Sequence, residues 1–359
     1  MKIGVILGVR PEIIKLAPVF RELVNRNIDH FVIHTNQHYS YDMDKLFFEE
    51  LNLNPPKYNL ECGYDSFKKQ ISFMSKRAFD VLQKEKPDNM IVFADPTSAF
   101  AGALAAAKAS IDISHIEAGL RSDDLRMLEE TNRIAIGQLA DYHFAPTVGA
   151  KQNLLDEGTN EERIHVVGNT IVDSVYQNME IANKDKSLLE KLNLEAKKYF
   201  LVTAHRGENV DDKETLSNIL KAMDMVYQKY KLPIVWPLHP RTKKMINTFN
   251  LKIPECIKII EPVGFLEFLQ LETNARLMIT DSGGIQEEAC ILKIPCVTMR
   301  LTTERPETVN VGSNIVAGLN PDKILESVET MMGRDTNWEN PFGDGKSAVK
   351  ILDTLKNIY

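Results

Sequence analysis

Two acidic residues follow short hydrophobic runs at points where the sequence predicts that β-strands end. Asp95 comes shortly after residues 90–93, and Glu117 comes directly after residues 113–116. Because parallel strands end at the same edge of a sheet, we expect these carboxylates to lie close together. Crowding of like charges raises the pKa of one carboxyl and lets it hold a proton near neutrality. The pair suits general acid/base chemistry, and capping of the following helices is the structural alternative.

The segment TDSGGIQEEA, residues 280–289, has the pattern of a phosphate-binding turn. The hydrophobic residues 277–279 before it indicate a buried strand, and a helix is expected to begin near Ile285. Ser282, Gly283 and Gly284 form the turn, where backbone N–H groups and the positive end of the helix dipole favour an anion. Glycines let the backbone approach a ligand closely. An ordinary capped helix after a tight turn is the alternative.

Basic residues accompany the turn after the first predicted strand, residues 2–7. Arg10 lies in the turn and Lys15 lies early in the helix that follows. Strand-to-helix junctions are where open α/β sheets bind their ligands. The segment has neither the GxxxxGK[ST] pattern of a P-loop nor the GxGxxG pattern of a dinucleotide site, so we expect no nicotinamide cofactor.

The chain repeats a rhythm of strand, polar tip and helix, which predicts doubly wound parallel sheets. Its 359 residues suggest two domains. We place the first at residues 1–168, rejoined by a helix at 346–359, and the second at 169–345. Residues 51–67 are polar and are predicted to form a loop. The strands are expected near residues 2–7, 30–35, 90–93, 113–116, 141–146, 164–167, 199–203, 234–237, 257–260, 277–279, 296–299 and 314–318.

Composition excludes several classes of protein. The hydrophobic share is 43%, the charged share is 26% and the formal net charge is −7, which does not favour nucleic-acid binding. The sequence begins directly with a predicted strand and has no run typical of a signal peptide or a membrane span, so we expect a cytoplasmic protein. The four cysteines lack CxxC spacing and are expected to be buried thiols, and the scattered histidines predict no metal site.

Taken together, the polar tips resemble those of the non-hydrolysing UDP-N-acetylglucosamine 2-epimerases. The matching segments run in family order from residue 8 to about residue 348, so the resemblance covers nearly the whole chain. The segments HIEAGLRS, TDSGGIQEEA and TTERPE are highly specific as a set. The others are GVRPEIIKLAP, NQH, EETNR, HFAPT, VVGNTIVDSV, VTAHRGEN and NPFGDGKSA.

This resemblance implies a GT-B fold, with two Rossmann-like domains and the sugar nucleotide in the cleft between them. It implies interconversion of UDP-GlcNAc and UDP-ManNAc without a cofactor, in a protein that forms a homodimer. In the family mechanism, loss of the C2 proton and of UDP gives 2-acetamidoglucal, and UDP adds back after protonation of the opposite face. Acid/base groups are therefore needed on both faces of C2.

The resemblance also implies roles for particular residues. The acids that match the family's catalytic positions are Asp95, Glu117 and Glu129, and His205 matches its essential histidine. Which carboxylate removes the proton and which returns it stays open. The positions that match substrate contacts are Arg10 and Lys15 near the diphosphate or sugar, Ser282, Gly283 and Gly284 at the phosphate, Glu288 at the ribose, Phe268 beside the uracil, and His239 and Arg305 on the nucleotide side.

Among the departures from the family pattern, two concern a second substrate site of the bacterial members. Gly207 stands where those members have an arginine, and Ser40 stands where they often have a glutamine. In those members both positions help to hold a second, activating UDP-GlcNAc, so the resemblance does not carry activation by substrate over to this chain. The alternatives are a hydrolysing epimerase that releases ManNAc, another UDP-sugar enzyme of the same fold, and an inactive sugar-nucleotide sensor. Three retained acids and His205 argue against the last.

Overall fold

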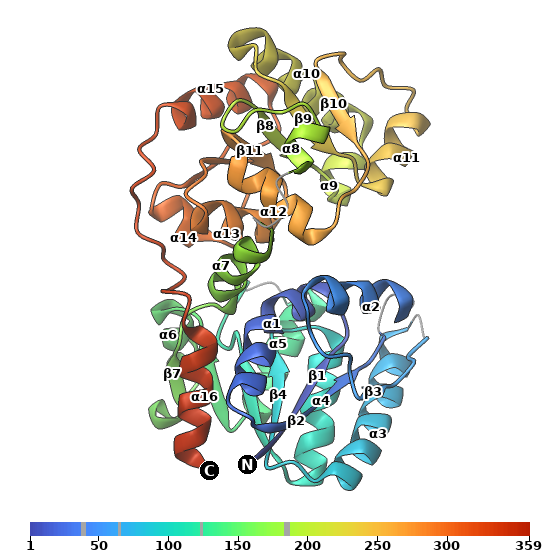
Figure 1. Ribbon diagram of the computed structural model, residues 1–359, viewed down its shortest axis with the longest axis vertical. Coiled ribbons are helices and arrows are strands. Elements are labelled where there is room, and N and C mark those ends of the chain that lie inside the picture. Colours follow the sequence, from blue (N-terminus) through green and yellow to red (C-terminus); the bar gives the residue numbers. More distant parts are fainter. Residues whose placement is uncertain (37–40, 64–65, 123–124, 183–186) are drawn as a thin grey trace. The chain divides into compact units, whose positions relative to one another are not determined.

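The computed structural model describes residues 1–36, 41–63, 66–122, 125–182 and 187–359, which form two compact units (Figure 1). The first unit comprises Met1–Ser174 and Phe342–Tyr359, and the second comprises Val175–Pro341. Each unit contains its own parallel sheet and its own buried hydrophobic core. The two-domain Rossmann-like α/β architecture expected from the sequence is confirmed.

The first unit is built on a seven-stranded sheet in the order β3-β2-β1-β4-β5-β6-β7, and its described strand pairs are all parallel. Its strands are β1 (Lys2–Leu7), β2 (Asp29–His34), β3 (Tyr58–Asn59), β4 (Asn89–Phe93), β5 (Asp112–Ile116), β6 (Tyr142–Ala145) and β7 (Ile164–Val166). Its helices are α1 (Arg10–Asn25), α2 (Tyr41–Glu50), α3 (Phe67–Glu85), α4 (Thr97–Ala109), α5 (Leu128–Leu139), α6 (Val148–Asp156) and α16 (Ser347–Ile358), with a 3-10 turn at Glu161–Arg163.

The prediction of a loop over residues 51–67 was wrong in part. The short strand β3 lies within that range and pairs with β2, and α3 already begins at Phe67. A strand of two residues is too short to show the alternation by which strands are recognised in a sequence. The helices α2 and α6 also carry weak patterns, and the sequence analysis did not predict them.

The helix α16 completes the first unit, where it packs on α1. Its start is held by Asp173, whose Oδ1 accepts a 2.9 Å hydrogen bond from the N–H of Ala348. Gly168 makes this return possible, because a Cβ at that residue would lie 2.9 Å from Ser347 Oγ and 3.1 Å from the carbonyl oxygen of Phe342. Gly168 also has a φ of +90°, which favours glycine.

The second unit is built on a six-stranded parallel sheet in the order β10-β9-β8-β11-β12-β13. Its strands are β8 (Phe200–Thr203), β9 (Ile234–Pro237), β10 (Ile257–Ile260), β11 (Leu277–Thr280), β12 (Cys296–Thr298) and β13 (Asn314–Val316). Its helices are α8 (Ser187–Lys191), α9 (Gly207–Val210), α10 (Lys213–Tyr230), α11 (Pro240–Thr248), α12 (Phe265–Asn274), α13 (Gly283–Ile291), α14 (Pro306–Asn310) and α15 (Pro321–Met332), and α7 (Thr170–Ala182) runs from the first unit into it.

Both sheets have a point where the strand order reverses direction. It lies between β1 and β4 in the first unit and between β8 and β11 in the second. In open parallel sheets, the loops beyond the carboxyl ends of the strands at such a point form the ligand crevice. The residues beyond these four strands are therefore the first place to look for a site. No helix in the described part of the chain is both long enough and apolar enough to span a membrane.

Candidate functional site

Asp95 lies just beyond β4, at the reversal point of the first sheet. Its Oδ2 is 2.5 Å from Nη2 of Arg133, and its backbone carbonyl accepts a 2.9 Å hydrogen bond from Nδ2 of Asn132. Burial raises the pKa of Asp95, the Arg133 guanidinium lowers it and the charge of Glu117 raises it, with a net rise. The capping alternative is wrong for Asp95, because Pro96 is the N-cap of α4.

Glu117 follows β5 directly and is 7% exposed. Its Oε1 lies 2.5 Å from Nζ of Lys15 and accepts a 2.9 Å hydrogen bond from Nδ2 of Asn169. Glu117 has a φ of +63°, and Ala94, next to Asp95, has a φ of +51°. Non-glycine residues rarely adopt this left-handed conformation, and such strain is characteristic of functional sites. Both predicted acids are thus on strained strand ends.

Glu129 lies in the exposed first turn of α5 and shares a cavity with Asp95. The cavity has a volume of about 220 Å³ and is lined by Val9, Asp95, Pro96, Thr97, Leu128, Glu129 and Asn132. Glu117 does not line this cavity, although its charge acts on Asp95. A larger cavity of about 460 Å³ in the same unit, beside Arg21, His30 and Lys57, contains none of the predicted site residues.

The turn after β1 carries Arg10 and is held together by Glu12. The guanidinium of Arg10 lies 5.1 Å from the ring centre of Phe47 in α2. Oε2 of Glu12 accepts hydrogen bonds from the N–H groups of Gly8 and Val9, at 2.6 and 3.0 Å, and from Ser98 Oγ at 3.1 Å. Burial raises the pKa of Glu12 to about 8. Glu12 therefore joins the turn beyond β1 to the start of α4 beside Asp95.

In the second unit, His205 and Asp281 face each other across the reversal point. His205 follows β8, Asp281 follows β11, and His205 Nδ1 lies 3.1 Å from Asp281 Oδ1. Oδ2 of Asp281 accepts hydrogen bonds from the N–H groups of His205 and Arg206 at 2.9 Å and from Nδ2 of Asn209 at 3.1 Å. Asp281 is completely buried, whereas the side chain of His205 is 41% exposed. A carboxylate at Nδ1 favours the tautomer that leaves Nε2 as the basic nitrogen.

The predicted phosphate turn forms the start of α13. Ser282 is its N-cap, as the capped-helix alternative expects, but its side chain makes no capping hydrogen bond. A Cβ on Gly283 or on Gly284 would have no heavy atom closer than 3.9 Å. Neither glycine is needed for packing, and neither has a positive φ. The free space over the first helical amides is what a bound anion requires.

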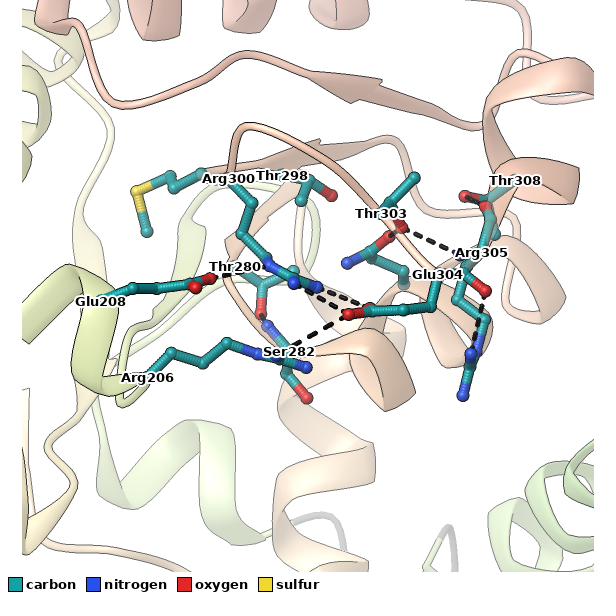
Figure 2. A network of polar contacts seen from close by, with 12 residues as sticks. Arg206, Glu208, Thr280, Ser282, Thr298, Arg300, Thr303, Glu304, Arg305 and Thr308 are labelled. Carbon is teal, nitrogen blue, oxygen red and sulfur yellow. Dashed lines mark hydrogen bonds and ion pairs between the residues drawn. The ribbon is translucent and has the colours of Figure 1, made fainter. Parts of the chain in front are cut away.

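Arg206, Arg300 and Arg305 lie around this turn in a network of polar contacts (Figure 2). Arg300 is 6% exposed and binds both carboxyl oxygens of Glu304, at 2.6 and 2.9 Å. Its Nε donates a 3.1 Å hydrogen bond to Glu208, and Arg206 lies 3.9 Å from Glu304. The pKa of Glu304 falls to about 2, chiefly through its hydrogen bonds with Arg300. The third arginine, Arg305, pairs with buried Glu287 at 2.6 Å.

The remaining predicted contacts have different surroundings. His239 is exposed and is the N-cap of α11, where its Nδ1 accepts a 3.2 Å hydrogen bond from the N–H of Arg241. Its ring centre is 5.5 Å from that of His205. Phe268 packs against the core of the second unit, and Glu288 is half-buried on α13. The predicted segment at Gln37–His38 and the position of Ser40 lie outside the described residues.

Comparison with known proteins identifies the family. The family profile described as UDP-N-acetylglucosamine 2-epimerase matches residues 21–356. This chain belongs to the UDP-N-acetylglucosamine 2-epimerase family. The epimerase of that name from Methanocaldococcus jannaschii is 53% identical, over 99% of each chain.

A crystal structure of the M. jannaschii UDP-GlcNAc 2-epimerase, in complex with UDP-GlcNAc and UDP, has a TM-score of 0.88 at 53% identity. The match covers 99% of this chain and 100% of that one. A UDP-2,3-diacetamido-2,3-dideoxy-D-glucuronate 2-epimerase from Pseudomonas aeruginosa is 37% identical over 100% of both chains. Relatives of this chain are therefore named for more than one UDP sugar.

Some residues of the candidate site were not predicted as such from the sequence. Asp281 occurred only within the segment TDSGGIQEEA and was given no role, although it is the buried partner of His205. Arg133 lies in the segment EETNR, but its ion pair with Asp95 joins residues 38 positions apart in the sequence. Glu12 and Asn169 likewise act through distant contacts. Their only signal was a polar residue inside a family motif, with nothing to name the partner. In the described part of the chain, no group of three or more histidines, cysteines and acids could hold a metal ion.

Proposed function

We propose that this protein catalyses the reversible epimerisation of UDP-GlcNAc to UDP-ManNAc at C2, by elimination and re-addition of UDP. The observation that carries the proposal is the meeting of Asp95 and Glu129 in one cavity, with Glu117 close enough to influence Asp95. Inversion at C2 needs one group that removes a proton and another that returns it to the opposite face. Separate carboxyl groups on different elements provide that pair.

In the proposed first step, a carboxylate of the first unit takes the C2 proton while the bond from C1 to the UDP oxygen breaks. The electrons of the C2–H bond form a C1=C2 double bond, and UDP leaves with the electrons of the C1–O bond. A carboxyl group then protonates C2 from the other face, and UDP adds again at C1. The raised pKa of Asp95 favours it as a group that carries a proton.

UDP must be retained between the two steps, and the second unit supplies suitable groups. Ser282, Gly283 and Gly284 offer amides to the phosphate, and Glu288 is assigned to the ribose and Phe268 to the uracil. Negative charge concentrates on the β-phosphate as UDP leaves, so nearby N–H groups and cations stabilise this state. His205, positioned by Asp281, is proposed to contact that leaving group through its exposed ring edge.

Of the other predicted contacts, Lys15 acts in the proposal by holding Glu117, and Arg10 supplies positive charge at the reversal point of the first sheet. Arg305 is proposed to support the turn through Glu287, and His239 to support His205.

The test is to incubate the purified protein with UDP-GlcNAc in D₂O and to follow the sugar by proton NMR. We expect deuterium at C2 together with the appearance of UDP-ManNAc. Free ManNAc would instead indicate the hydrolysing reaction. No exchange at C2 would contradict both reactions and leave the substrate of this family member to be sought among other UDP sugars.

A further inference from the structure

Asn169 lies directly before α7 and is buried beside Glu117. Its side chain makes two hydrogen bonds with opposite roles. Oδ1 accepts the N–H of Ile171 at 3.0 Å, and Nδ2 donates to Oε1 of Glu117 at 2.9 Å. The first bond caps the start of the helix, and the second reaches an acid 52 positions earlier in the sequence. One residue therefore serves both the helix and the candidate site.

The capping bond does not by itself require an asparagine. Asparagine, aspartate and serine cap helices about equally well, because each offers an oxygen to the unpaired N–H groups of the first turn. Aspartate at this position would place a second carboxylate against Glu117, and the two would repel. An amide supplies an acceptor and two donors at once. The contact with Glu117 therefore explains the residue type where capping alone does not.

The orientation of the amide is determined by its two neighbours. A rotated amide would turn its NH₂ group toward the N–H of Ile171 and its oxygen toward the Glu117 carboxylate, so both contacts would be repulsive. The backbone of Asn169 is held as well, since its N–H donates a 2.8 Å hydrogen bond to the carbonyl of Phe342. The segment that leads back to α16 thus supports the residue from behind.

Glu117 needs such a support because of its place in the fold. It has a φ of +63° directly after β5, a conformation that persists only where the surroundings hold it. Nζ of Lys15 lies 2.5 Å from the same oxygen, Oε1, that accepts from Asn169. A cation from α1 and an amide beside α7 thus bind one carboxyl oxygen, and they fix the plane of the carboxylate and the direction of its other oxygen.

We propose that Asn169 is a positioning residue for the reaction at C2: its Nδ2 holds the Glu117 carboxylate ionised and correctly oriented while its Oδ1 caps α7. This inference rests on the proposed function, which makes Glu117 one of the acid/base groups. A hydrogen bond to an ionised carboxylate is of the strong, charge-assisted kind. Loss of the donor should therefore affect proton transfer at C2 more than it affects the binding of UDP, whose proposed phosphate, ribose and uracil contacts belong to the second unit.

The first experiment compares Asn169→Ala with a matched control, Asn89→Ala. Asn89 is also a buried amide of the first unit, but it lies at the start of β4 and donates to Tyr359 at 3.3 Å, whereas Asp95 lies beyond the end of that strand. We expect Asn169→Ala to lower kcat about tenfold, the scale of a lost hydrogen bond to a charged group, with UDP affinity little changed. Asn89→Ala should leave kcat near the wild-type value. Equal losses of kcat in the two variants, or a loss of UDP affinity that matches the loss of kcat, would overturn the proposal.

The second experiment uses Asn169→Asp, which keeps the capping oxygen but replaces the donor by an acid. At low pH the new carboxyl group can be protonated and donate to Glu117, whereas at high pH both groups are ionised and repel. We expect kcat of this variant, divided by that of the wild type, to fall as pH rises from about 5.5 to about 8.5. The division corrects for Lys15 and Asp95, whose charges also act on Glu117. A ratio that does not fall with pH would overturn the proposal.

A third measurement separates this inference from the proposed reaction. In protein labelled with ¹³C at the glutamate carboxyl carbons, the NMR signal of Glu117 is identified by its absence from Glu117→Gln. Its titration should move to higher pH in Asn169→Asp than in the wild type, because a nearby like charge disfavours ionisation. An unchanged titration would overturn the proposal even in an active enzyme.

Absence of C2 exchange in the wild type would contradict the epimerase reaction and leave the support of Glu117 to be judged by this titration. Thermal unfolding of each variant checks that it folds. If Asn169→Ala does not fold, the two measurements on Asn169→Asp, which retains the helix cap, still decide.

Discussion

The two units carry their candidate residues at the same place in the same kind of sheet, but they hold them differently. In the first unit, Asp95 and Glu117 lie on strained strand ends, and a cation from a helix pairs with each. In the second, a buried carboxylate organises the loop beyond β8, and ion pairs surround an open glycine turn. One arrangement suits groups that exchange protons, and the other suits a site that holds an anion still.

The largest expected change in turnover comes from Asp95→Asn. If the first unit moves the proton and the second holds UDP, turnover should fall by about a thousandfold, within the range of general acid/base catalysis. UDP affinity, measured by calorimetry, should change little. Glu130→Gln is a nearby control, because Glu130 also pairs with Arg133 but does not line the cavity. Lost UDP binding in Asp95→Asn would contradict the division of roles.

The second prediction is that acid destabilises the first unit before the second. The reason is that the buried histidines lie in the first unit. Burial lowers the pKa of His34 and His143 to about 4 and that of His115 to about 3, whereas the ordinary value is 6.5. The unfolded chain binds these protons first, so their contribution is complete above pH 6.5 and is lost as pH falls toward 4. At pH 5 the loss is about 2 kcal/mol for each histidine.

The pKa of Glu12 is raised to about 8, so this residue stabilises the folded first unit as pH falls over the same range. Its effect offsets the loss of stability from about one histidine. The net effect should still destabilise the first unit. Proteolysis at pH 7 and pH 5, with mass spectrometry of the fragments, measures which unit opens first. We expect cleavage within residues 1–174 at pH 5, and first cleavage within the second unit would contradict the prediction.

The third prediction tests whether His205 and Asp281 act as one group. Each of His205→Ala and Asp281→Asn should lower turnover by about a hundredfold, because each removes the correctly oriented imidazole. The double variant should be little worse than either single variant, since residues that act as a unit are not additive. Multiplied losses in kcat would mean that the two act independently. Melting temperatures verify that the Asp281 variant remains folded.

The smallest expected effect comes from Gly284→Ala. The space around Gly284 is open in the protein, so the new methyl group should affect only a bound phosphate and weaken UDP about tenfold, or 1.4 kcal/mol. The matched control is Gly207→Ala, also in the first turn of a helix, where the added Cβ meets the flexible end of Arg241. Equal changes in UDP affinity for the two variants would remove the evidence for an anion at α13.

The sequence predicted the elements that carry strong patterns and the acids at their ends. The parallel strands of both units are hydrophobic runs, so their positions could be read from local pattern. β3 has only two residues, which are too few to show the alternation of hydrophobic and polar side chains by which a strand is predicted. Asp95 could be named because it follows a predicted strand, and His205 because it follows a strand and lies in a family motif. Their partners, Arg133 and Asp281, could not be identified without knowing which segments lie side by side. That arrangement depends on sheet order and helix packing rather than on local sequence.

The return of α16 to the first unit has a consequence for biosynthesis. The first unit is assembled from two separate segments of the chain, Met1–Ser174 and Phe342–Tyr359, whereas the second is one continuous segment. A ribosome therefore releases everything needed for the second unit before it releases the helix that packs on α1. Asp173 and the face of α1 that α16 covers are not packed until that helix has been synthesised. The first unit, which contains Asp95 and Glu117, is therefore the last to be completed as the protein is made.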